Sequence, residues 1–362
     1  MKKILLALSF ILAIKGVNAQ LPTECVPKKQ NVMFIKQKKM IAILVEEDEE
    51  YIAELKKSGK NEDVLKKYLE SLKNYNDNLK ELLPKYFTFP KAVEFKTYSE
   101  VIAMPIAKRG TYTFLVYNLS ESTGLVKVQE SGTGKESETA GLVTCTLNFF
   151  DVKNDKGNLA IYKGQTHFEE VDLYAKLEIY TKVTPKSEDN DANMIYFRSI
   201  PALNPSKGDL AYCFMQTQKT LEEAMLPPAK PSKNEDENAK VLKTKTLLIR
   251  KENLDKGVTE EGIKGVYKND FKLVDKAEFD QAILTKDPKY CYLMVVPLYS
   301  MPMPIGGAIS KTNISCGQIL IDAATNKTAA ISFAKVMFAG MGAQVCNEVK
   351  LKHLEKYQKA SE

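Results

Sequence analysis

Two stretches of the chain repeat the same spacing of residues, and this repeat limits the possible folds more than any other sequence feature. In the first half, Glu100 is followed twelve residues later by Tyr112-Thr113-Phe114-Leu115. In the second half, Glu278 is followed twelve residues later by Tyr290-Cys291-Tyr292-Leu293, in the same register and without gaps. A repeat of this kind indicates two copies of one structural unit.

A second pair of spacings follows in the same order. Cys145 precedes Asp151 by six residues, and Cys316 precedes Asp322 by six. Each aspartate is followed by a polar stretch, and aspartate starts turns by accepting a hydrogen bond from the backbone two residues on. We therefore expect a hairpin centred on each aspartate.

Hydrophobic patterns predict the same series of elements in both halves. A buried strand is followed by a helix that begins, in the second half, at the capping residue Thr259. A strand, a short helix and a third strand come next. The pairs, first half before second, are strands 40–45 and 245–249, helices 61–83 and 259–266, strands 92–97 and 271–275, helices 98–103 and 276–284, and strands 111–117 and 290–296.

The predicted fold class is therefore α/β, with two similar lobes from an internal repeat. Each lobe is expected to be a mixed β-sheet with the order β-α-β-α-β-hairpin, because helices between consecutive strands imply parallel pairing and hairpins add antiparallel strands. Residues 171–183 are predicted as a further strand, although helical spacing also fits them. Residues 346–359 are predicted as a helix.

The N-terminus has the features of a secretory signal peptide. Lys2 and Lys3 precede an apolar run at 4–14, and Val17-Asn18-Ala19 places small or modest side chains before Gln20. The run is too short to span a bilayer, which takes about twenty residues. We expect cleavage after residue 19 to give a soluble exported protein without a transmembrane segment. The predicted domains are a signal peptide at 1–19, a first lobe at 20–226, a linker at 227–240 and a second lobe at 241–362.

The charge of the expected mature chain is nearly balanced. Loss of Lys2, Lys3 and Lys15 from the 52 basic residues leaves 49 against 46 acidic ones. Nucleic acids and anionic membranes attract proteins with a strong positive excess. We therefore expect neither as a partner.

An even number of cysteines allows disulfides in an oxidising compartment. The alternative is buried free thiols, because several of these residues lie in apolar, strand-like runs. Both interpretations remain open from the sequence. The candidate disulfide residues are Cys25, Cys145, Cys213, Cys291, Cys316 and Cys346.

The sequence contains little material for acid–base catalysis. His167 and His353 are the only histidines, and neither lies near a recognisable nucleophile. We expect His353, on a lysine-rich helix, to face solvent. Asp151 and Asp322 occupy equivalent positions and could form a carboxylate pair for glycoside hydrolysis, but a role in turns explains them. We predict no catalytic site; the alternative is an exported hydrolase with a carboxylate-based or His167-dependent site.

One acidic stretch begins like a calcium loop. Asp189, Asp191 and Asn193 supply oxygen ligands at alternate positions. Met194 stands where an EF-hand needs glycine, and Ile200 where it needs glutamate, so that motif is excluded. An irregular calcium-stabilised loop stays possible, and an acidic surface loop is the alternative. No cofactor is predicted.

A glycine-rich stretch at 132–135 does not meet the requirements of a phosphate loop. Gln129 replaces the first glycine, and Glu136 replaces the hydroxyl residue that reaches magnesium. We interpret residues 118–140 as a long polar loop.

A segment at 290–310 has no charged residue, yet its prolines and glycines exclude a spanning helix. We predict a buried strand followed by a rigid apolar loop at 298–309. Ligands bind beyond the carboxyl ends of parallel strands, so this loop could bind a ligand or partner, or pack between the lobes. Two methionines alone are too few for copper. The candidate residues are Tyr299, Met301, Met303, Ile305, Gly306 and Gly307.

Two short phrases, Glu94-Phe95-Lys96-Thr97 and Thr246-Leu247-Leu248-Ile249, together with the export signal and many lysines, are similar to those of secreted or periplasmic proteins of Bacteroidetes-type bacteria. The resemblance implies a periplasmic or secreted location and no particular activity. The predicted function is an exported soluble binding or scaffold protein of the bacterial cell envelope, whose partner is an envelope protein or a small ligand. A structural subunit of an oligomer is a further possibility.

Overall fold

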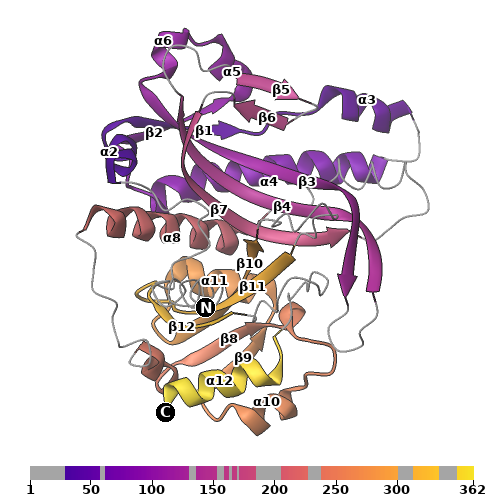
Figure 1. Cartoon of the computed structure of the whole chain (residues 1–362), viewed down its shortest axis with the longest axis vertical. Helices are drawn as coiled ribbons and strands as arrows, with labels where there is room; N and C mark the ends of the chain where they lie inside the picture. The colour runs from indigo at the N-terminus through magenta and orange to yellow at the C-terminus, as the bar shows by residue number, and fades with distance from the viewer. Residues whose placement is uncertain are drawn as a thin grey trace, which may run out of the picture.

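The computed structural model in Figure 1 has two five-stranded sheets, a two-stranded hairpin and helices on the sheet faces. This mixed α/β architecture confirms the predicted class. The structure describes residues 29–57, 62–129, 136–152, 159–162, 165–168, 171–184, 205–226, 238–300, 313–333 and 349–362.

Both large sheets combine parallel and antiparallel strands. The first sheet, in spatial order, consists of β2 (Ala92–Thr97), β1 (Lys39–Leu44), β3 (Tyr112–Gln129), β4 (Glu136–Val152) and β7 (Val171–Thr184). The second consists of β9 (Phe271–Val274), β8 (Thr246–Arg250), β10 (Tyr290–Ser300), β11 (Asn313–Asp322) and β12 (Thr328–Phe333). In each sheet the first three strands are parallel and the last two continue antiparallel.

The strand registers of the two sheets correspond residue by residue. Thr113 of β3 lies opposite Asp151 of β4, and Cys291 of β10 lies opposite Asp322 of β11. These four residues are the ones that the sequence spacings align. On the other side, Thr113 pairs with Met40 of β1, and Cys291 pairs with Leu247 of β8.

A register irregularity also falls at the same place in both sheets. Between β4 and β7 the register shifts between Phe149 and Phe150. Between β11 and β12 it shifts between Leu320 and Ile321. Counted back from Asp151 and Asp322, these are the same positions. A bulge of this kind bends its strand locally, so both sheets bend at one equivalent point.

The helices begin at residues that suit a helix start. Thr97 caps α5 by accepting a hydrogen bond from the backbone N–H of Glu100, and Asp275 caps α11 through Glu278 in the same way. Thr259 caps α10, as predicted. The helices are α2 (Lys29–Gln37), α3 (Glu49–Lys57), α4 (Glu62–Tyr86), α5 (Tyr98–Ala103), α6 (Ile106–Arg109), α8 (Lys207–Met225), α10 (Glu260–Val266), α11 (Lys276–Thr285) and α12 (Leu351–Ser361), with short 3₁₀ turns η4 (Lys240–Lys243) and η5 (Lys251–Asn253).

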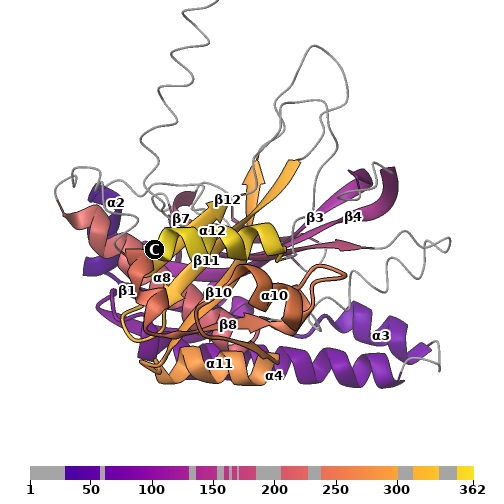
Figure 2. The same cartoon turned by 90° about the horizontal axis from the view of Figure 1, so that it is seen from below.

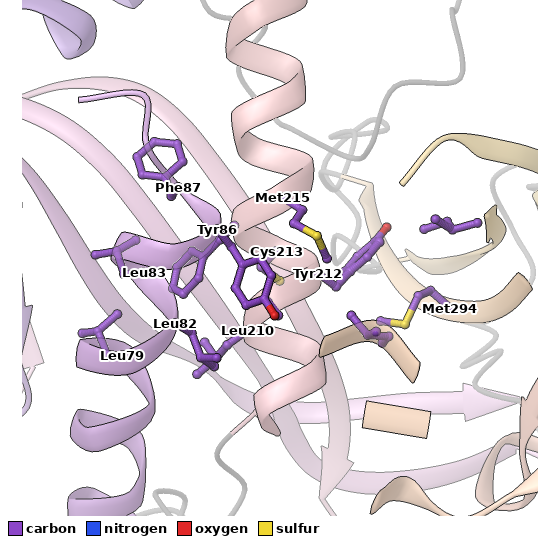
Figure 3. Packing of buried hydrophobic residues seen from close by; sticks show 14 of the residues in the cluster. Leu79, Leu82, Leu83, Tyr86, Phe87, Leu210, Tyr212, Cys213, Met215 and Met294 are labelled. Carbon is purple, nitrogen blue, oxygen red and sulfur yellow. The ribbon is translucent and has the colours of Figure 1, made fainter. Parts of the chain in front are cut away.

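One hydrophobic core joins the two sheets. Helix α8 lies between them, with α4 of the first half on one side and α11 of the second on the other (Figure 1). In Figure 3, Leu210 of α8 lies near Leu82 of α4, while Tyr212 lies on the opposite side of α8, the side that faces Met294 of β10. Since apolar burial stabilises by about 25 cal/mol per Å², this shared core holds the two halves together.

The outer faces of the sheets carry separate cores. On the first sheet, Tyr98 and Val101 of α5 pack with Ile41, Ile43 and Phe114. On the second sheet, α10 and α12 cover a cluster that includes Leu247, Ile249, Cys291, Leu293, Leu320, Leu354 and Tyr357. Helices α4 and α8 cover the face of the first sheet that is turned toward the second sheet, and α11 covers the face of the second sheet that is turned toward the first. Helix α11 corresponds to α5, which lies on the outer face of the first sheet. The two faces that meet are therefore not equivalent.

Within the described residues, the first half has elements without a described counterpart in the second half. The pair Ser122–Leu142 of β3 and β4 corresponds to Ser300–Asn313, the last described pair of β10 and β11. Beyond Ser122–Leu142, the β3–β4 ladder continues to the pair Gln129–Glu136. The hairpin β5 (Leu159–Tyr162) and β6 (Gln165–Phe168) is inserted between β4 and β7.

Helix α4 has 25 residues where α10 has 7, and in Figure 2 it projects with α3 on the same side as β3 and β4. In the described part of the chain, every helix is too short or too polar to cross a bilayer.

The predicted loop at 118–140 is wrong for residues 118–129 and 136–140, while residues 130–135 lie outside the described residues. Residues 112–129 and 136–152 form paired strands, with one register shift between Thr123 and Val126. The Gly, Ser and Thr residues that suggested a loop are compatible with antiparallel pairing, which satisfies the backbone groups of both strands. The alternating run 126–129 (Val-Lys-Val-Gln) is in fact typical of a strand.

Candidate functional site

The predicted ligand loop lies mostly outside the described residues. Strand β10 extends to Ser300, and Tyr299 pairs with Ile314 of β11. Tyr299 is therefore a strand residue and not a loop residue, because the β10–β11 ladder continues past the expected end of the strand. The other candidates, Met301, Met303, Ile305, Gly306 and Gly307, fall in the undescribed stretch 301–312. Their role in ligand or partner binding stays a prediction.

The polar groups at the carboxyl ends of the parallel strands in the first sheet form hydrogen bonds with other residues of the chain. The Asn76 side chain of α4 accepts a hydrogen bond from Val45 N at 3.0 Å and donates one to Val45 O at 2.9 Å. Glu46 accepts from both the N–H and the hydroxyl of Ser99, each at 3.1 Å. A carboxylate at the start of α5 is favoured by the helix dipole. The polar groups just past β1 are thus already engaged.

The carboxylate of Asp322 forms an ion pair and a turn hydrogen bond. Its carboxylate lies 2.6 Å from Lys245 Nζ, with 14% and 16% of the two side chains exposed, and it accepts a hydrogen bond from Ala324 N at 3.0 Å. This is the turn role expected from the sequence. Asp151 lies in β4 opposite Thr113, and its side chain is outside the described part. A catalytic pair made from these aspartates finds no support at Asp322.

His353 does not face solvent as expected. The ring is half-buried, its Nδ1 lies 2.8 Å from Gln318 Nε2, and Nδ1 accepts a hydrogen bond from Lys350 N at 3.1 Å. Tyr357 donates to Gln318 Oε1 at 3.0 Å. Since Nδ1 accepts, the proton is assigned to Nε2. Burial first, and then the charges of Lys352, Lys350 and Lys356, lower the pKa of His353 to about 4.

The other histidine, His167, lies in the β5–β6 hairpin opposite Ala160. Its side chain is not described. A His167-dependent hydrolase site therefore stays a prediction.

Two cysteines are buried free thiols. Cys213 lies in the core between the sheets and Cys291 in the outer core of the second sheet. For these two residues the structure agrees with the alternative of buried free thiols, because each thiol is enclosed by apolar side chains in a different core. Burial raises the pKa of Cys291 to about 12, so its thiol stays protonated.

The remaining four cysteines are not tested. Cys145 and Cys316 occupy backbone positions in β4 and β11, while Cys25 and Cys346 lie outside the described residues. Disulfides among these four stay a prediction.

Sequence reasoning missed a buried charge cluster between the two halves, the Arg250 cluster of Ser206, Asp209, Arg250 and Asp280. Arg250 Nη2 donates to Asp209 Oδ1 at 2.7 Å and lies 3.3 Å from Asp280 Oδ1. Ser206 Oγ donates to Asp280 Oδ1 at 2.9 Å. The three charged side chains are only 10% to 14% exposed. No local motif marks these residues, because they come from β8, α8 and α11.

The described residues contain no group of three or more His, Cys, Asp or Glu side chains that could hold a metal ion. The calcium candidates Asp189, Asp191 and Asn193 lie in the undescribed stretch 185–204. Calcium binding there stays a prediction.

Comparison with protein-family models, with curated proteins and with solved structures finds no match to this chain. Function must therefore be inferred from the residues themselves. In the described residues, the polar groups at the sheet edge, at Asp322 and around His353 bond to other groups of the same chain.

Proposed function

We propose that the protein is an exported binding or scaffold component of the bacterial cell envelope, built from two copies of one α/β unit. The observation that carries the duplication is the common register: Thr113–Asp151 corresponds to Cys291–Asp322, and the bulges fall at equivalent positions. The capping pairs of α5 and α11 also correspond. Independent origins would not be expected to give the same register at every strand pair.

In such a duplicated protein, the parts common to both lobes are sufficient to form the fold. The additions found in one lobe only are then the best candidates for a specialised role, because function resides in sites added to a fold. Among the described residues, the elements seen in one lobe only are the extension of β3 and β4, the β5–β6 hairpin and the long α4. We assign binding to the β3–β4 extension, residues 123–141, first.

The backbone of β3 supports this assignment. Strand β3 pairs with β1 only over residues 112–115, while β4 pairs with it on the other side as far as Gln129. Among the described strands, none pairs with residues 116–129 on the β1 side. A strand edge of this length can accept an extended segment of a partner by backbone hydrogen bonds. We propose that an envelope protein contributes that segment.

A shortened variant tests the proposed binding role. Replacing residues 124–140 by Asn-Gly joins Thr123 to Gly141, which are paired residues, through a turn sequence that suits hairpins. The variant should keep a native circular dichroism spectrum and cooperative unfolding. It should lose partners that the full-length mature protein retains from a detergent-solubilised envelope fraction, measured by quantitative mass spectrometry.

Two further variants locate the binding surface. The double variant Met301→Ser, Met303→Ser addresses the predicted apolar loop, and Lys73→Ala on the exposed face of α4 is the control. If the loop variant loses the partners while the shortened variant keeps them, the binding surface is the loop and not the extension. If all variants retain the same proteins as the control, neither surface binds them.

Export is tested separately. Expression with the native N-terminus should give a mature protein that begins at Gln20 by intact mass and that is released by osmotic shock or found in the medium. A retained N-terminus in the cytosolic fraction would contradict the proposed location.

A further inference from the structure

The Arg250 cluster contains one more acid than base. Arg250 contacts both Asp209 of α8 and Asp280 of α11, and its Cζ lies 4.3 Å from the Phe279 ring centroid. Its Nε is buried and has no hydrogen-bond partner among the described residues. One guanidinium between two carboxylates leaves a net charge of about −1 in a largely buried place, and uncompensated buried charge is costly.

The cluster lies at the contact between the two halves. Asp280 accepts a hydrogen bond from the hydroxyl of Ser206, the residue that caps α8. Asp209 completes the capping box of that helix. The start of α8 is thus fixed to α11 through one carboxylate. A change in the charge of Asp280 therefore acts directly on the contact between α8 and α11.

We propose that the Arg250 cluster makes the docking of α8 on α11 pH-sensitive, by binding one proton from solvent at Asp280 as acidity rises. The carboxylate becomes a carboxylic acid, which removes its repulsion with Asp209 and leaves Arg250 paired with Asp209 alone. The contact is tightest in acid and weakens as the proton leaves.

The direction follows from the surroundings of Asp280. Burial, and then the charge of Asp209, raise its pKa, while Ser206, Arg250 and the Gly208 backbone lower it by less. An acid with a raised native pKa binds more protons in the native state than in the unfolded state. Its stabilising contribution is therefore present below the unfolded pKa of about 3.9 and is lost as pH rises through the native pKa.

The other charges near the cluster have separate partners or greater exposure. Glu252 lies 3.8 Å from Arg250 Nη1 but is 58% exposed. Lys207 pairs with Glu81 of α4 at 2.6 Å. Asp209 and Arg250 are therefore the charges that govern Asp280.

The test compares the pH dependence of thermal unfolding between pH 4 and 7 in the full mature protein. Asp280→Asn mimics the protonated acid, so the wild type should lose stability relative to this variant as pH rises. Asp209→Asn removes the like charge and should flatten the dependence. Glu252→Gln should keep the wild-type profile. Parallel profiles of the wild type and Asp280→Asn would overturn the proposal.

Hydrogen exchange keeps the proposal testable even if a variant fails to fold. In a His353→Gln background, which removes the opposing pH dependence of that histidine, amides in residues 205–212 and 276–285, corrected for intrinsic exchange rates, should be more protected at pH 5 than at pH 7. The protection factor should change by up to about tenfold for each pH unit by which the native pKa exceeds the unfolded value. Equal or lower protection at pH 5 would also overturn it.

Discussion

Gly208 in α8 and Asp280 in α11 approach each other so closely that no side chain fits at Gly208. A Cβ built on Gly208 would lie 2.3 Å from Asp280 Oδ1 and 2.8 Å from Asp280 Cα. The second distance involves backbone, which cannot rotate away. Glycine at this position therefore sets how closely the start of α8 approaches α11, and with it the geometry of the Arg250 cluster.

Gly208→Ala is expected to destabilise the protein by about 1–3 kcal/mol, the usual cost of forcing extra atoms into a packed site. Gly265→Ala is the matched control, because Gly265 is also helical and nothing lies within 4 Å of its Cβ position. That variant should gain up to about 1 kcal/mol from helix propensity. Chemical denaturation measures both, and equal effects would contradict the close contact.

The Lys245–Asp322 ion pair is expected to contribute strongly because both side chains are largely buried. Asp322→Ala leaves Lys245 unpaired and removes the acceptor for Ala324 N, which should cost about 3 kcal/mol. Asp77→Ala removes the partner of Lys73 in an exposed pair and should change stability little. A similar loss in both variants, measured by urea unfolding, would show that Asp322 is not structurally special.

Several strands and helices could be predicted from the sequence because local patterns encode them. Alternating and continuous apolar runs marked β1, β8 and β10, and Thr259 marked the start of α10. The spacing of Asp151 and Asp322 even indicated residues that occupy corresponding ladder positions. Register follows from the hydrophobic pattern together with turn position, and both are local features.

Helix α8 could not be predicted in this way. Its residues 210–217 are all buried, since the helix lies between two sheets and contacts α4 and α11. A helix that is buried on nearly every side has no polar face, so the 3.6-residue periodicity disappears. Helix α12, with solvent on its outer side, kept that pattern and was found.

The Arg250 cluster was unpredictable for a related reason. Its members lie on three elements, and only the packing of the two halves brings them together. The position of His353, in contrast, had a signal that could have been used. It lies four residues before the buried Tyr357 and next to the buried Leu354, on the inward side of the helix.

His353 predicts a loss of stability in mild acid. Its native pKa of about 4 lies below the ordinary histidine pKa of 6.5, so the unfolded state binds more protons between these values. The stabilising contribution is complete above about pH 6.5 and falls as pH drops through 4. His353→Gln should lack this component of the pH profile. Tyr357→Phe is the control: it weakens the contact with Gln318 but should keep the profile of the wild type.

Cys213 and Cys291 are expected to react only after unfolding. Both thiols are buried, and the raised pKa of Cys291 suppresses the reactive thiolate. Iodoacetamide without reductant should leave both unmodified in the native protein and alkylate both in denaturant, as read by peptide mass mapping. Failure to alkylate either one in denaturant without reductant would mean that it is disulfide-bonded.

Two neighbouring tyrosines of the shared core should respond in opposite directions to loss of their hydroxyl groups. The rings of Tyr212 and Tyr292 lie edge to face at 6.4 Å. The Tyr212 hydroxyl is buried and has no hydrogen-bond partner in the described part of the chain, whereas Tyr292 donates to Asn326 Oδ1 at 3.2 Å. Tyr212→Phe removes an unsatisfied polar group and should stabilise by about 1 kcal/mol, while Tyr292→Phe should destabilise by about 1 kcal/mol.

The two tyrosine variants control for each other, because each removes one oxygen from the same aromatic cluster. The unfolding free energies of both, with equal denaturant slopes, give the comparison. A loss of stability in Tyr212→Phe as large as that in Tyr292→Phe would mean that the Tyr212 hydroxyl has a partner in solution. The core between α8 and β10 would then contain a polar contact in place of a purely apolar one.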